Sequence, residues 1–449
     1  MKIITKTLLN ISLLLIAATL NAQFYAESIN DIKVPKNFIW GTALSEYQVS
    51  GAAYCRNSNW SDFETTLPER SGDACQFWQR YKDDIALMKQ MGVQSLRFSV
   101  EWCKIEPTEG KFDADALQHY VDVCDALLQA NITPMITLHH FVHPSWFEQK
   151  DGFADPANIH YFERYCAYVF EHLSDKVHLW CTINEPTIFT FQGYARGVFP
   201  PGRTNLISAW HVLRNMIHAH TRVYHKLKGM KNGKDAQIGL VHQYLKFHSY
   251  TSWNPLEMIP GLLFNALLND SVMEFLKTGE FNGWFGVHYN AHTTKNNDFI
   301  GLNYYSRATI KASLDLSNPV DAAHYPDEIM TDMPYAIYPQ GFYDALIDLK
   351  ALRIPIYVTE NGIADAKDEH RDLWIRSYLA AMDKAIADGA DVRGYYYWSI
   401  MDNFEWDMGY EKKFGLIEVD RQTQERKIRT GAQFYVAVLQ NALANSNSI

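Results

Sequence analysis

The chain has 449 residues, of which 47% are hydrophobic, 14% aromatic and 20% charged, a composition that is typical of globular enzymes and excludes disordered and fibrous classes. Its 51 acidic residues outnumber its 41 lysines and arginines, and the net charge of -10 argues against a nucleic-acid partner, because phosphate binding needs clustered basic residues. No Pro/Gly/Ser-rich linker divides the sequence, so we expect one domain.

The first 22 residues have the pattern of a secretory signal peptide. Two lysines precede an apolar stretch from Leu8 to Leu20, and the small residue Ala22 stands before Gln23. An uncleaved membrane anchor is the alternative, but the apolar stretch is short and is interrupted by polar residues. We therefore predict a signal peptide over residues 1-22 and a secreted or periplasmic domain over residues 23-449, without stable membrane insertion after cleavage.

Eight apolar runs follow in chain order, and their lack of polar alternation is typical of parallel strands buried on both faces. They are Phe38 to Thr42, Ser95 to Trp102, Thr133 to His140, His178 to Glu185, Gln237 to Tyr244, Phe299 to Tyr305, Pro355 to Glu360 and Val392 to Ile400.

Amphipathic helical patterns separate these runs, at Tyr81 to Met91, Asp115 to Ala130, Ala157 to Leu173, Ser208 to Leu227, Gln340 to Ala351 and Leu373 to Ala387. The polar, turn-rich stretch from Lys311 to Pro334 predicts an inserted loop, and Thr430 to Ala444 predicts a closing helix. The alternation predicts a single α/β domain, a (β/α)8 TIM barrel, whose chemistry belongs at the C-terminal ends of the strands.

The six cysteines match no small disulfide scaffold and no zinc pattern. Cys124, Cys166 and Cys181 lie among apolar helix or strand positions, so free buried thiols are expected there. Only Cys55 and Cys75 occupy loop-like sequence in which a disulfide is conceivable. The sequence contains no metal-ligand cluster and no glycine-rich phosphate loop, so we expect neither a metal nor another cofactor.

Two carboxylates each end an apolar strand and precede chain-breaking residues, in Thr182-Ile-Asn-Glu185-Pro and Val358-Thr-Glu360-Asn-Gly. Two carboxylates in one pocket are the minimum equipment for cleaving a glycosidic bond, because one donates a proton while the other attacks or polarises water. Each motif alone is more often an ordinary loop, so the further motifs carry the argument.

With those further motifs, the chain resembles glycoside hydrolase family 1, the retaining β-glucosidase family. They run from Phe38-Ile-Trp-Gly-Thr-Ala-Leu-Ser-Glu-Tyr-Gln48 through Arg97-Phe-Ser, Thr137-Leu-His-His140, Asn303-Tyr-Tyr305 and Trp398-Ser-Ile-Met-Asp-Asn-Phe-Glu-Trp406 to Phe414-Gly. The resemblance implies double displacement with Glu360 as the nucleophile and Glu185 as the acid/base. Arg97 and Tyr305 would hold Glu360 ionised, and Asn184 would contact the sugar 2-hydroxyl. A retaining enzyme needs its two carboxyls about 5 Å apart.

The resemblance also implies the residues of a sugar pocket. Trp398 would form its floor, and the remaining contacts would come from Gln48, His140, Asn184, Asn303, Glu405, Trp406 and Phe414. A carboxylate at Glu405, facing the 4- and 6-hydroxyls, accepts their hydrogen bonds but repels a 6-phosphate. The expected substrate is therefore a small-molecule β-glycoside or oligosaccharide with an unphosphorylated terminal sugar, β-D-glucose before other sugars.

Three positions depart from the commoner family pattern, namely Val49-Ser50 after Gln48, Phe141 and Thr187, of which Phe141 and Thr187 are expected near the leaving group. A transglycosidase would use the same residues, and a catalytically silent sugar-binding barrel would lack one glutamate. The sequence does not separate hydrolysis from transglycosylation. It also does not separate glucose from galactose, fucose or mannose.

Overall fold

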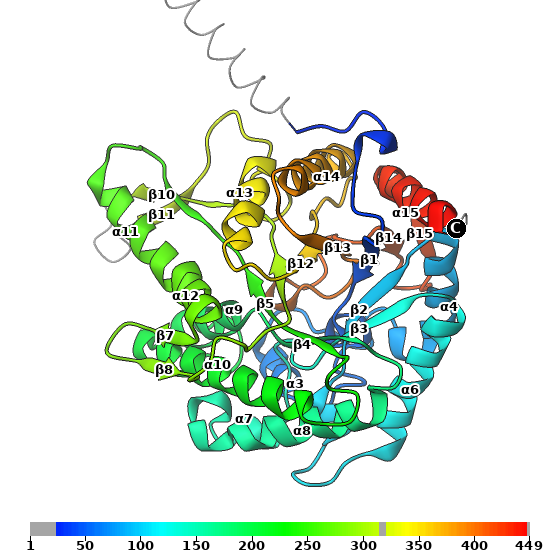
Figure 1. Cartoon of the computed structure of the whole chain (residues 1–449), viewed down its shortest axis with the longest axis vertical. Helices are drawn as coiled ribbons and strands as arrows, with labels where there is room; N and C mark the ends of the chain where they lie inside the picture. The colour runs from blue at the N-terminus through cyan, green and yellow to red at the C-terminus, as the bar shows by residue number, and fades with distance from the viewer. Residues whose placement is uncertain (1–23, 314–319, 447–449) are drawn as a thin grey trace, which may run out of the picture.

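A closed barrel of eight parallel strands lies at the centre of the computed structural model, which describes residues 24–313 and 320–446 (Figure 1). The barrel strands are β1 (Ile39–Ala43), β2 (Ser95–Ser99), β3 (Thr133–Thr137), β4 (Leu179–Asn184), β5 (Gln237–Gln243), β9 (Phe299–Asn303), β12 (Ile356–Asn361) and β13 (Val392–Trp398). Strand β1 pairs with both β2 and β13, which closes the ring. Each predicted apolar run supplies one strand, and the (β/α)8 barrel is confirmed. The predicted signal peptide lies outside the described residues.

The outer ring is built from the long helices between and after these strands. They are α4 (Phe77–Met91), α6 (Ala114–Gln129), α8 (Ile159–Leu173), α10 (Leu206–Lys228), α13 (Pro339–Lys350), α14 (Arg371–Ala387) and α15 (Gln433–Ser446). Local sequence fixes their ends: the Asp113 carboxylate caps α6 by accepting from two backbone amides, and α4 stops at Gly92, whose φ of 87° suits glycine. Strands β4 and β12 are buried along their whole length, as parallel barrel strands should be.

Several strands end earlier at their C-terminal ends than the sequence predicts. The β2 strand ends at Ser99, and Trp102 starts the short helix α5 (Trp102–Ile105). The β3 strand ends at Thr137, so His140 belongs to the loop that follows. Apolar residues continue past the last ladder pair because these βα loops are themselves buried, and the hydrophobic pattern therefore does not mark where pairing stops.

Shorter elements occupy the connections. The helices are α2 (Glu46–Ser50), α3 (Asn59–Phe63), α7 (Ser145–Glu148), α9 (Pro186–Thr190), α11 (Pro255–Asn265), α12 (Ser271–Thr278), two π-helical segments, η5 (Phe191–Arg196) and η6 (Ala266–Asp270), and the 3-10 turns η1 (Ile29–Asp31), η2 (Glu64–Thr66), η3 (Gly152–Ala154), η4 (Pro156–Asn158), η7 (Trp406–Met408) and η8 (Thr430–Ala432). The strands are β6 (Phe247–Ser249), β7 (Glu280–Asn282), β8 (His288–Asn290), β10 (Ala308–Ala312), β11 (Val320–Ala323), β14 (Ile417–Val419) and β15 (Arg426–Ile428).

The prediction of a loop from Lys311 to Pro334 is wrong in part. Strand β10 pairs antiparallel with β11, with Thr309 opposite Ala323, and parallel with β6, which gives a three-stranded sheet outside the barrel. The polar sequence hid these strands because a short strand on a solvated sheet has too few buried positions to show a pattern. Among the described residues, none of the helices is both long and apolar enough to cross a membrane.

All six cysteines are free and buried, so the conceivable Cys55–Cys75 disulfide is not formed. The Cys75 thiol instead donates to the backbone oxygen of Asp402 at 2.8 Å. Burial raises the pKa of Cys75 to about 12, which keeps this thiol protonated and unreactive. Cys124, Cys166 and Cys181 are core residues, as predicted.

Candidate active site

Most of the predicted site residues line one cavity at the C-terminal ends of the barrel strands, and Arg97, Gln48 and Asn303 lie behind it. Asn184 ends β4, Glu360 lies near the end of β12, and Trp398 ends β13. All three line a cavity of about 400 Å³ together with Glu185 and Tyr305. Polar side chains lie at the strand ends because there they can find hydrogen-bond partners. Inside the barrel the same side chains would be buried without partners.

Register shifts in the barrel pairing lie beside two of these residues, Glu360 and Asn184. The pairing of β12 with β9 shifts between Val358 and Glu360, and the pairing of β4 with β5 shifts between Cys181 and Asn184. Such irregularities locally re-aim side chains, and they are frequent beside active sites. Both residues therefore lie at the cavity as part of the barrel strands, and no inserted loop is needed to place them.

Two donors hold the Glu360 carboxylate. Arg97 Nη1 donates to Oε1 at 2.6 Å, and the Tyr305 hydroxyl donates to Oε2 at 2.6 Å. The ion pair is almost completely shielded from water, because the side chains of Arg97 and Glu360 are only 1% and 4% exposed. Charge-assisted bonds of this length favour the ionised carboxylate.

Arg97 belongs to a hydrogen-bond network that connects the two catalytic candidates, Glu360 and Glu185. Its Nη2 donates to Asn184 Oδ1 at 2.7 Å, and its Nε donates to Thr137 Oγ1 at 3.1 Å. Asn303 Nδ2 donates to the same Asn184 oxygen at 3.1 Å and to Glu185 Oε1 at 2.6 Å. A continuous hydrogen-bonded chain thus runs from Glu360 to Glu185.

Glu185 is held by a strained but well-anchored turn. It follows β4 with φ 44° and ψ 62°, in the left-handed region, and occupies the N-cap position of α9 just before Pro186, without a side-chain capping bond. Its amide donates to Val241 O at 2.9 Å, which secures the turn. A non-glycine residue in this conformation costs of order 1–3 kcal/mol and occurs where the surroundings over-determine it, often at functional sites.

The two carboxyl groups differ in their surroundings. Burial raises the pKa of Glu185 well above its ordinary value, and the negative charge of Glu360 raises it further. Glu185 has the Asn303 amide as its side-chain partner, whereas Glu360 accepts from a guanidinium and a phenol. Glu185 is therefore suited to donate a proton, and the two donors on Glu360 match the carboxylate partner that acid-assisted displacement requires.

Aromatic rings form the wall beside these carboxyls. The His140 ring stacks on Trp398 at 5.7 Å and on Trp406 at 6.0 Å between ring centres. Burial, with Arg97 nearby, lowers the pKa of His140 well below its ordinary value, so the ring is neutral. Its Nε2 lies 3.2 Å from the Asn184 amide nitrogen, while its Nδ1 has no partner in the described residues.

Glu405 and Gln48 form a second polar group. Gln48 Nε2 lies 3.2 Å from Glu405 Oε2 and donates to Phe404 O at 2.9 Å. Glu405 lines the cavity, whereas Gln48 lies behind it with an Oε1 that has no partner in the described residues. Burial, followed by the charge of Glu360, raises the pKa of Glu405 to about 8. Near pH 7 this carboxyl is thus mainly protonated, so charge alone does not exclude phosphate there.

The remaining expected residues divide into lining and supporting positions. Phe414 lines the cavity and meets Tyr305 edge-on at 5.9 Å, whereas Asn303 acts from behind through its bonds to Asn184 and Glu185. Of the two departures expected near the leaving group, Phe141 lines the cavity. Thr187 is buried in α9 and does not line it.

Other lining residues were not expected from the sequence. Met333 and Tyr335 reach the cavity from the stretch after β11, and Ile188, Phe191 and Arg196 come from α9 and η5. None belongs to a motif, because their positions depend on how long connections fold over the barrel. For Met333, Tyr335, Ile188 and Phe191 the apolar or aromatic side chain is the only signal in the sequence, and Arg196 has none. Within residues 24–313 and 320–446, no group of three or more His, Cys, Asp or Glu side chains is arranged to hold a metal ion.

The chain is similar in sequence to known glycoside hydrolases. The family model described as "Glycosyl hydrolase family 1" matches residues 30–443. A 1,4-beta-D-glucan glucohydrolase from Thermotoga neapolitana is 30% identical, with 91% of this chain and 98% of that protein covered. Beta-glucosidase A from Thermotoga maritima is also 30% identical, with 92% and 99% covered.

Solved structures give the same relationship. A beta-glycosidase from Pyrococcus horikoshii superposes with a TM-score of 0.84 at 36% identity and covers 92% of this chain and 96% of its own. A family 1 β-glucosidase from Thermotoga maritima superposes with a TM-score of 0.83 at 29% identity and covers 92% and 99%. Sequence and structural similarity therefore both span nearly the whole described chain.

Proposed function

Because this chain belongs to glycosyl hydrolase family 1 and is an O-glycosyl hydrolase, we propose that it is a retaining, exo-acting β-glycosidase, with β-glucosides as its main substrates. In this proposal Glu360 is the nucleophile and Glu185 is the general acid/base. Arg97 and Tyr305 orient Glu360, and Asn303 orients Glu185.

The first step forms a glycosyl ester. A Glu360 carboxylate oxygen attacks the anomeric carbon while the Glu185 proton moves to the leaving oxygen, so the aglycone departs as an alcohol. The developing positive charge on the sugar is stabilised by the adjacent carboxylate. Asn184 lies between Arg97 and His140, where its amide can meet the 2-hydroxyl.

The second step reverses the roles of the same groups. Once Glu360 is esterified its negative charge is gone, so the charge repulsion that raises the pKa of Glu185 is relieved. Glu185 is then more acidic and accepts a proton from the incoming water, which attacks the anomeric carbon. Glu360 leaves as a carboxylate, to which Arg97 and Tyr305 donate again.

One observation carries the proposal, namely the unequal hydrogen bonding of the two glutamates. Glu360 receives a guanidinium and a phenol at 2.6 Å each, and Glu185 receives a neutral amide in a buried position that favours its protonated form. A sugar-binding barrel without activity has no need of this asymmetry.

The sugar is proposed to be unphosphorylated. Arg196 is the one lysine or arginine among the described residues that line the cavity. Its Nη1 donates to Gln192 Oε1 at 3.1 Å. A bound phosphate draws on several such cations. Glu405, which lines the cavity, offers a hydrogen-bonding group for neutral hydroxyls, and the relatives named above include a Beta-glucosidase A.

Hydrolysis of nitrophenyl glycosides tests this proposal. The purified protein is given the β-glucoside, β-galactoside, β-fucoside and β-mannoside, together with the α-glucoside as a control, and the first-formed sugar anomer is followed by NMR. We expect cleavage of β-glycosides with the β-anomer released first. Release of the α-anomer, or cleavage of the α-glucoside alone, would contradict the proposal.

A further inference from the structure

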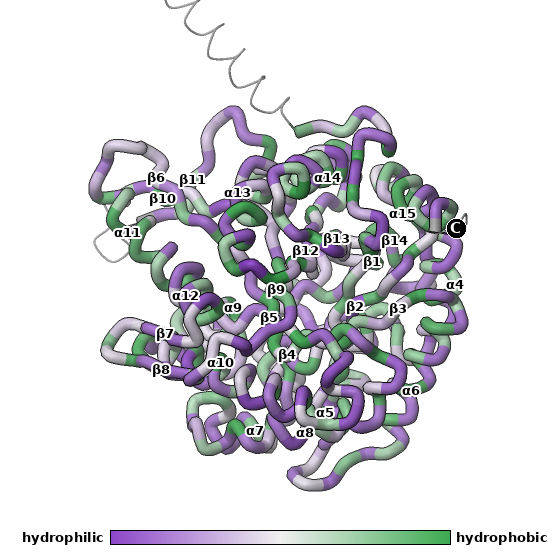
Figure 2. Tube along the Cα trace, viewed as in Figure 1, coloured by the Kyte–Doolittle hydropathy of each residue, from purple (hydrophilic) through white to green (hydrophobic). Residues whose placement is uncertain are grey.

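Helix α11, at the edge of the molecule, exposes only apolar residues. They are Pro255, Leu256, Met258, Ile259, Leu262 and Leu263. Trp253, in the turn before the helix, is 80% exposed. Figure 2 shows the hydrophobic stretch of this helix at the periphery, away from the barrel. The outer surface of α11 is therefore apolar along the length of the helix.

The helix is fixed in this orientation by polar contacts on its opposite side. The buried Glu257 carboxylate accepts from the amides of Thr251 at 2.5 Å and Ala312 at 3.2 Å. The Asn265 side chain exchanges two hydrogen bonds with the backbone of Phe247, at 2.9 and 2.8 Å. An amphipathic helix usually buries its leucines and exposes its glutamate, and α11 does the reverse.

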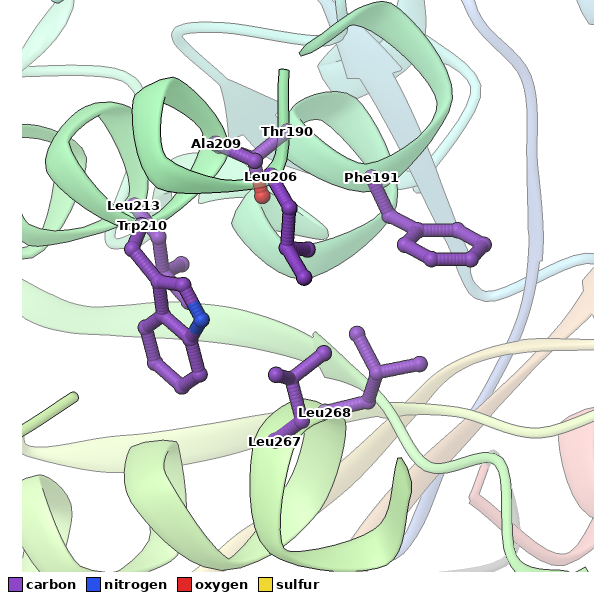
Figure 3. A pocket seen from close by; sticks show the side chains of 8 residues that line it. All are labelled: Thr190, Phe191, Leu206, Ala209, Trp210, Leu213, Leu267 and Leu268. Atoms are coloured by element: carbon purple, nitrogen blue, oxygen red, sulfur yellow. The ribbon is translucent and has the colours of Figure 1, made fainter. Parts of the chain in front are cut away.

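The segment that follows α11 attaches the helix to the rest of the molecule. The π-helical segment η6 begins directly after α11, and its Leu267 and Leu268 are buried. Figure 3 shows these two leucines projecting toward Phe191 and Leu206 from the other side of a small gap. Helix α11 is therefore supported by packed apolar side chains, and its outer surface is preformed.

Residues of neighbouring segments extend this surface. Leu206 and Trp284 line a groove of about 610 Å³ together with Leu256, Ile259 and Leu263 of α11. The residue after Trp284 is also an exposed aromatic. We define the α11 face by eight large apolar residues that are between 40% and 80% exposed, namely Leu206, Trp253, Leu256, Met258, Ile259, Leu262, Leu263 and Phe285.

The α11 face is large enough for a stable protein interface. With about 200 Å² for a fully exposed large apolar residue, its eight residues present roughly 900 Å² of surface. The largest apolar patch on a typical monomer covers about 300–600 Å², whereas each partner in a standard interface buries about 800 Å². The face therefore exceeds the usual patch of a monomer and reaches the area that a stable dimer needs.

Charge favours a second copy of this chain over a membrane as the occupant. Residues 251–270 contain no lysine or arginine, whereas helices that lie on membranes are typically rich in both. Two copies with a net charge of -10 each repel one another in general. Within the described chain, however, no charged side chain lines the groove and none is exposed on α11. Two such faces can therefore meet without bringing like charges together.

The face also combines a projecting side chain with a hollow. Trp253 projects at one end of α11, and the groove lies beside the same helix. In a two-fold symmetric dimer every contact is made twice, so a side chain that projects from one copy can fill the groove of the other in both directions. Tryptophan is enriched among the residues that contribute most to binding at interfaces. We therefore expect Trp253 to be an anchor of the contact.

We propose that the α11 face is the interface of a symmetric homodimer, in which α11 of one copy packs against α11 of the other. Neither Glu185 nor Glu360 belongs to this face. The dimer is therefore independent of the catalytic assignment, and a test of one does not decide the other.

Sedimentation velocity of the purified protein from about 0.5 to about 50 µM tests the proposal, because interfaces of standard size have dissociation constants of micromolar or below. We expect a species of twice the chain mass within this range. Ile259→Glu/Leu262→Glu places two charges on each face and should give a monomer with an unchanged far-UV circular dichroism spectrum. Leu128→Glu is the matched control, since Leu128 is 41% exposed on α6 outside the face, and it should remain dimeric. A parent protein that is monomeric throughout this range, or a double variant that is still dimeric, would overturn the proposal.

Chemical cross-linking locates the contact independently. All six native cysteines are buried, so Leu262→Cys adds the one exposed thiol of the chain. A bismaleimide should join two copies of Leu262→Cys and should leave Leu128→Cys monomeric in a denaturing gel. Cross-linking of Leu128→Cys alone, or of neither variant, would contradict an interface at α11.

Cosedimentation with phosphatidylcholine vesicles tests the membrane as the other occupant. A dimeric parent protein that stays in the supernatant supports the proposal. A monomeric parent protein that binds the vesicles, with binding lost in Ile259→Glu/Leu262→Glu, would assign the α11 face to a membrane and overturn it.

Discussion

Replacing Glu185 with glutamine removes a proton while preserving the shape of the site. Asn303 Nδ2 donates to Glu185 Oε1 at 2.6 Å, and the glutamine side-chain oxygen can accept the same bond. The turn remains anchored because its contact to Val241 O comes from the backbone amide. The variant therefore tests the acid/base role with little change in structure.

The size of the effect should depend on the leaving group. General acid catalysis contributes about 10² to 10⁴ in rate, or about 2.7 to 5.4 kcal/mol, to a substrate whose leaving oxygen needs protonation. A dinitrophenyl glucoside needs little protonation, so its kcat/KM should fall less than about tenfold. Its kcat should fall more, because water in the second step still needs a base.

The pH profile gives an independent readout. Burial and the charge of Glu360 raise the pKa of Glu185, so the parent enzyme should lose kcat/KM on the alkaline side as this proton is lost. In Glu185→Gln that alkaline limb should disappear. Equal losses of kcat/KM for methyl and dinitrophenyl glucosides, or an unchanged alkaline limb, would refute the acid/base assignment.

Three other predictions concern separate parts of the account. Tyr305→Phe removes the 2.6 Å hydroxyl bond to Glu360, so kcat/KM should fall about 10- to 150-fold irrespective of the leaving group; a loss confined to poor leaving groups would contradict this. The pKa of Glu405 is raised to about 8, so ionisation of this carboxyl destabilises the folded parent protein as the pH rises. The melting temperature of Glu405→Gln should therefore rise relative to that of the parent between pH 5 and pH 8. A difference in melting temperature that does not change with pH would contradict this. Exported protein from its own host should begin near Gln23 by mass spectrometry, and an intact Met1 terminus in a cytosolic fraction would remove the signal peptide from the account.

The barrel was predictable because its strands obey a simple physical rule. Parallel strands buried on both faces must be apolar throughout, so β4, β9 and β12 stand out from the amphipathic helices around them. The catalytic candidates Glu185 and Glu360 were also visible, since each interrupts such a run with a charge. What the sequence did not contain was the end of each strand, which depends on pairing with a neighbour.

The remaining features depend on contacts between segments that are far apart in the sequence, so the sequence alone does not predict them. Helix α11 was missed because it contains Pro260 and turns its leucines outward, contrary to the usual amphipathic pattern. Tyr335 reaches the cavity from a polar connection, and the backbone oxygen of its neighbour Ala336 accepts from the Ser306 hydroxyl at 2.6 Å, a contact between segments far apart in the sequence. The role of Asn303 as the partner of Glu185 likewise depends on two strands meeting in space.

The most direct test of the central claim is to identify the residue that carries the covalent intermediate. An activated 2-deoxy-2-fluoro-β-glucoside slows the second step, so the glycosyl ester accumulates and can be located by peptide mass spectrometry. We expect one equivalent of label on Glu360 in the parent enzyme and none in Glu360→Ala. Label on Glu185, or hydrolysis without any ester at Glu360, would contradict it.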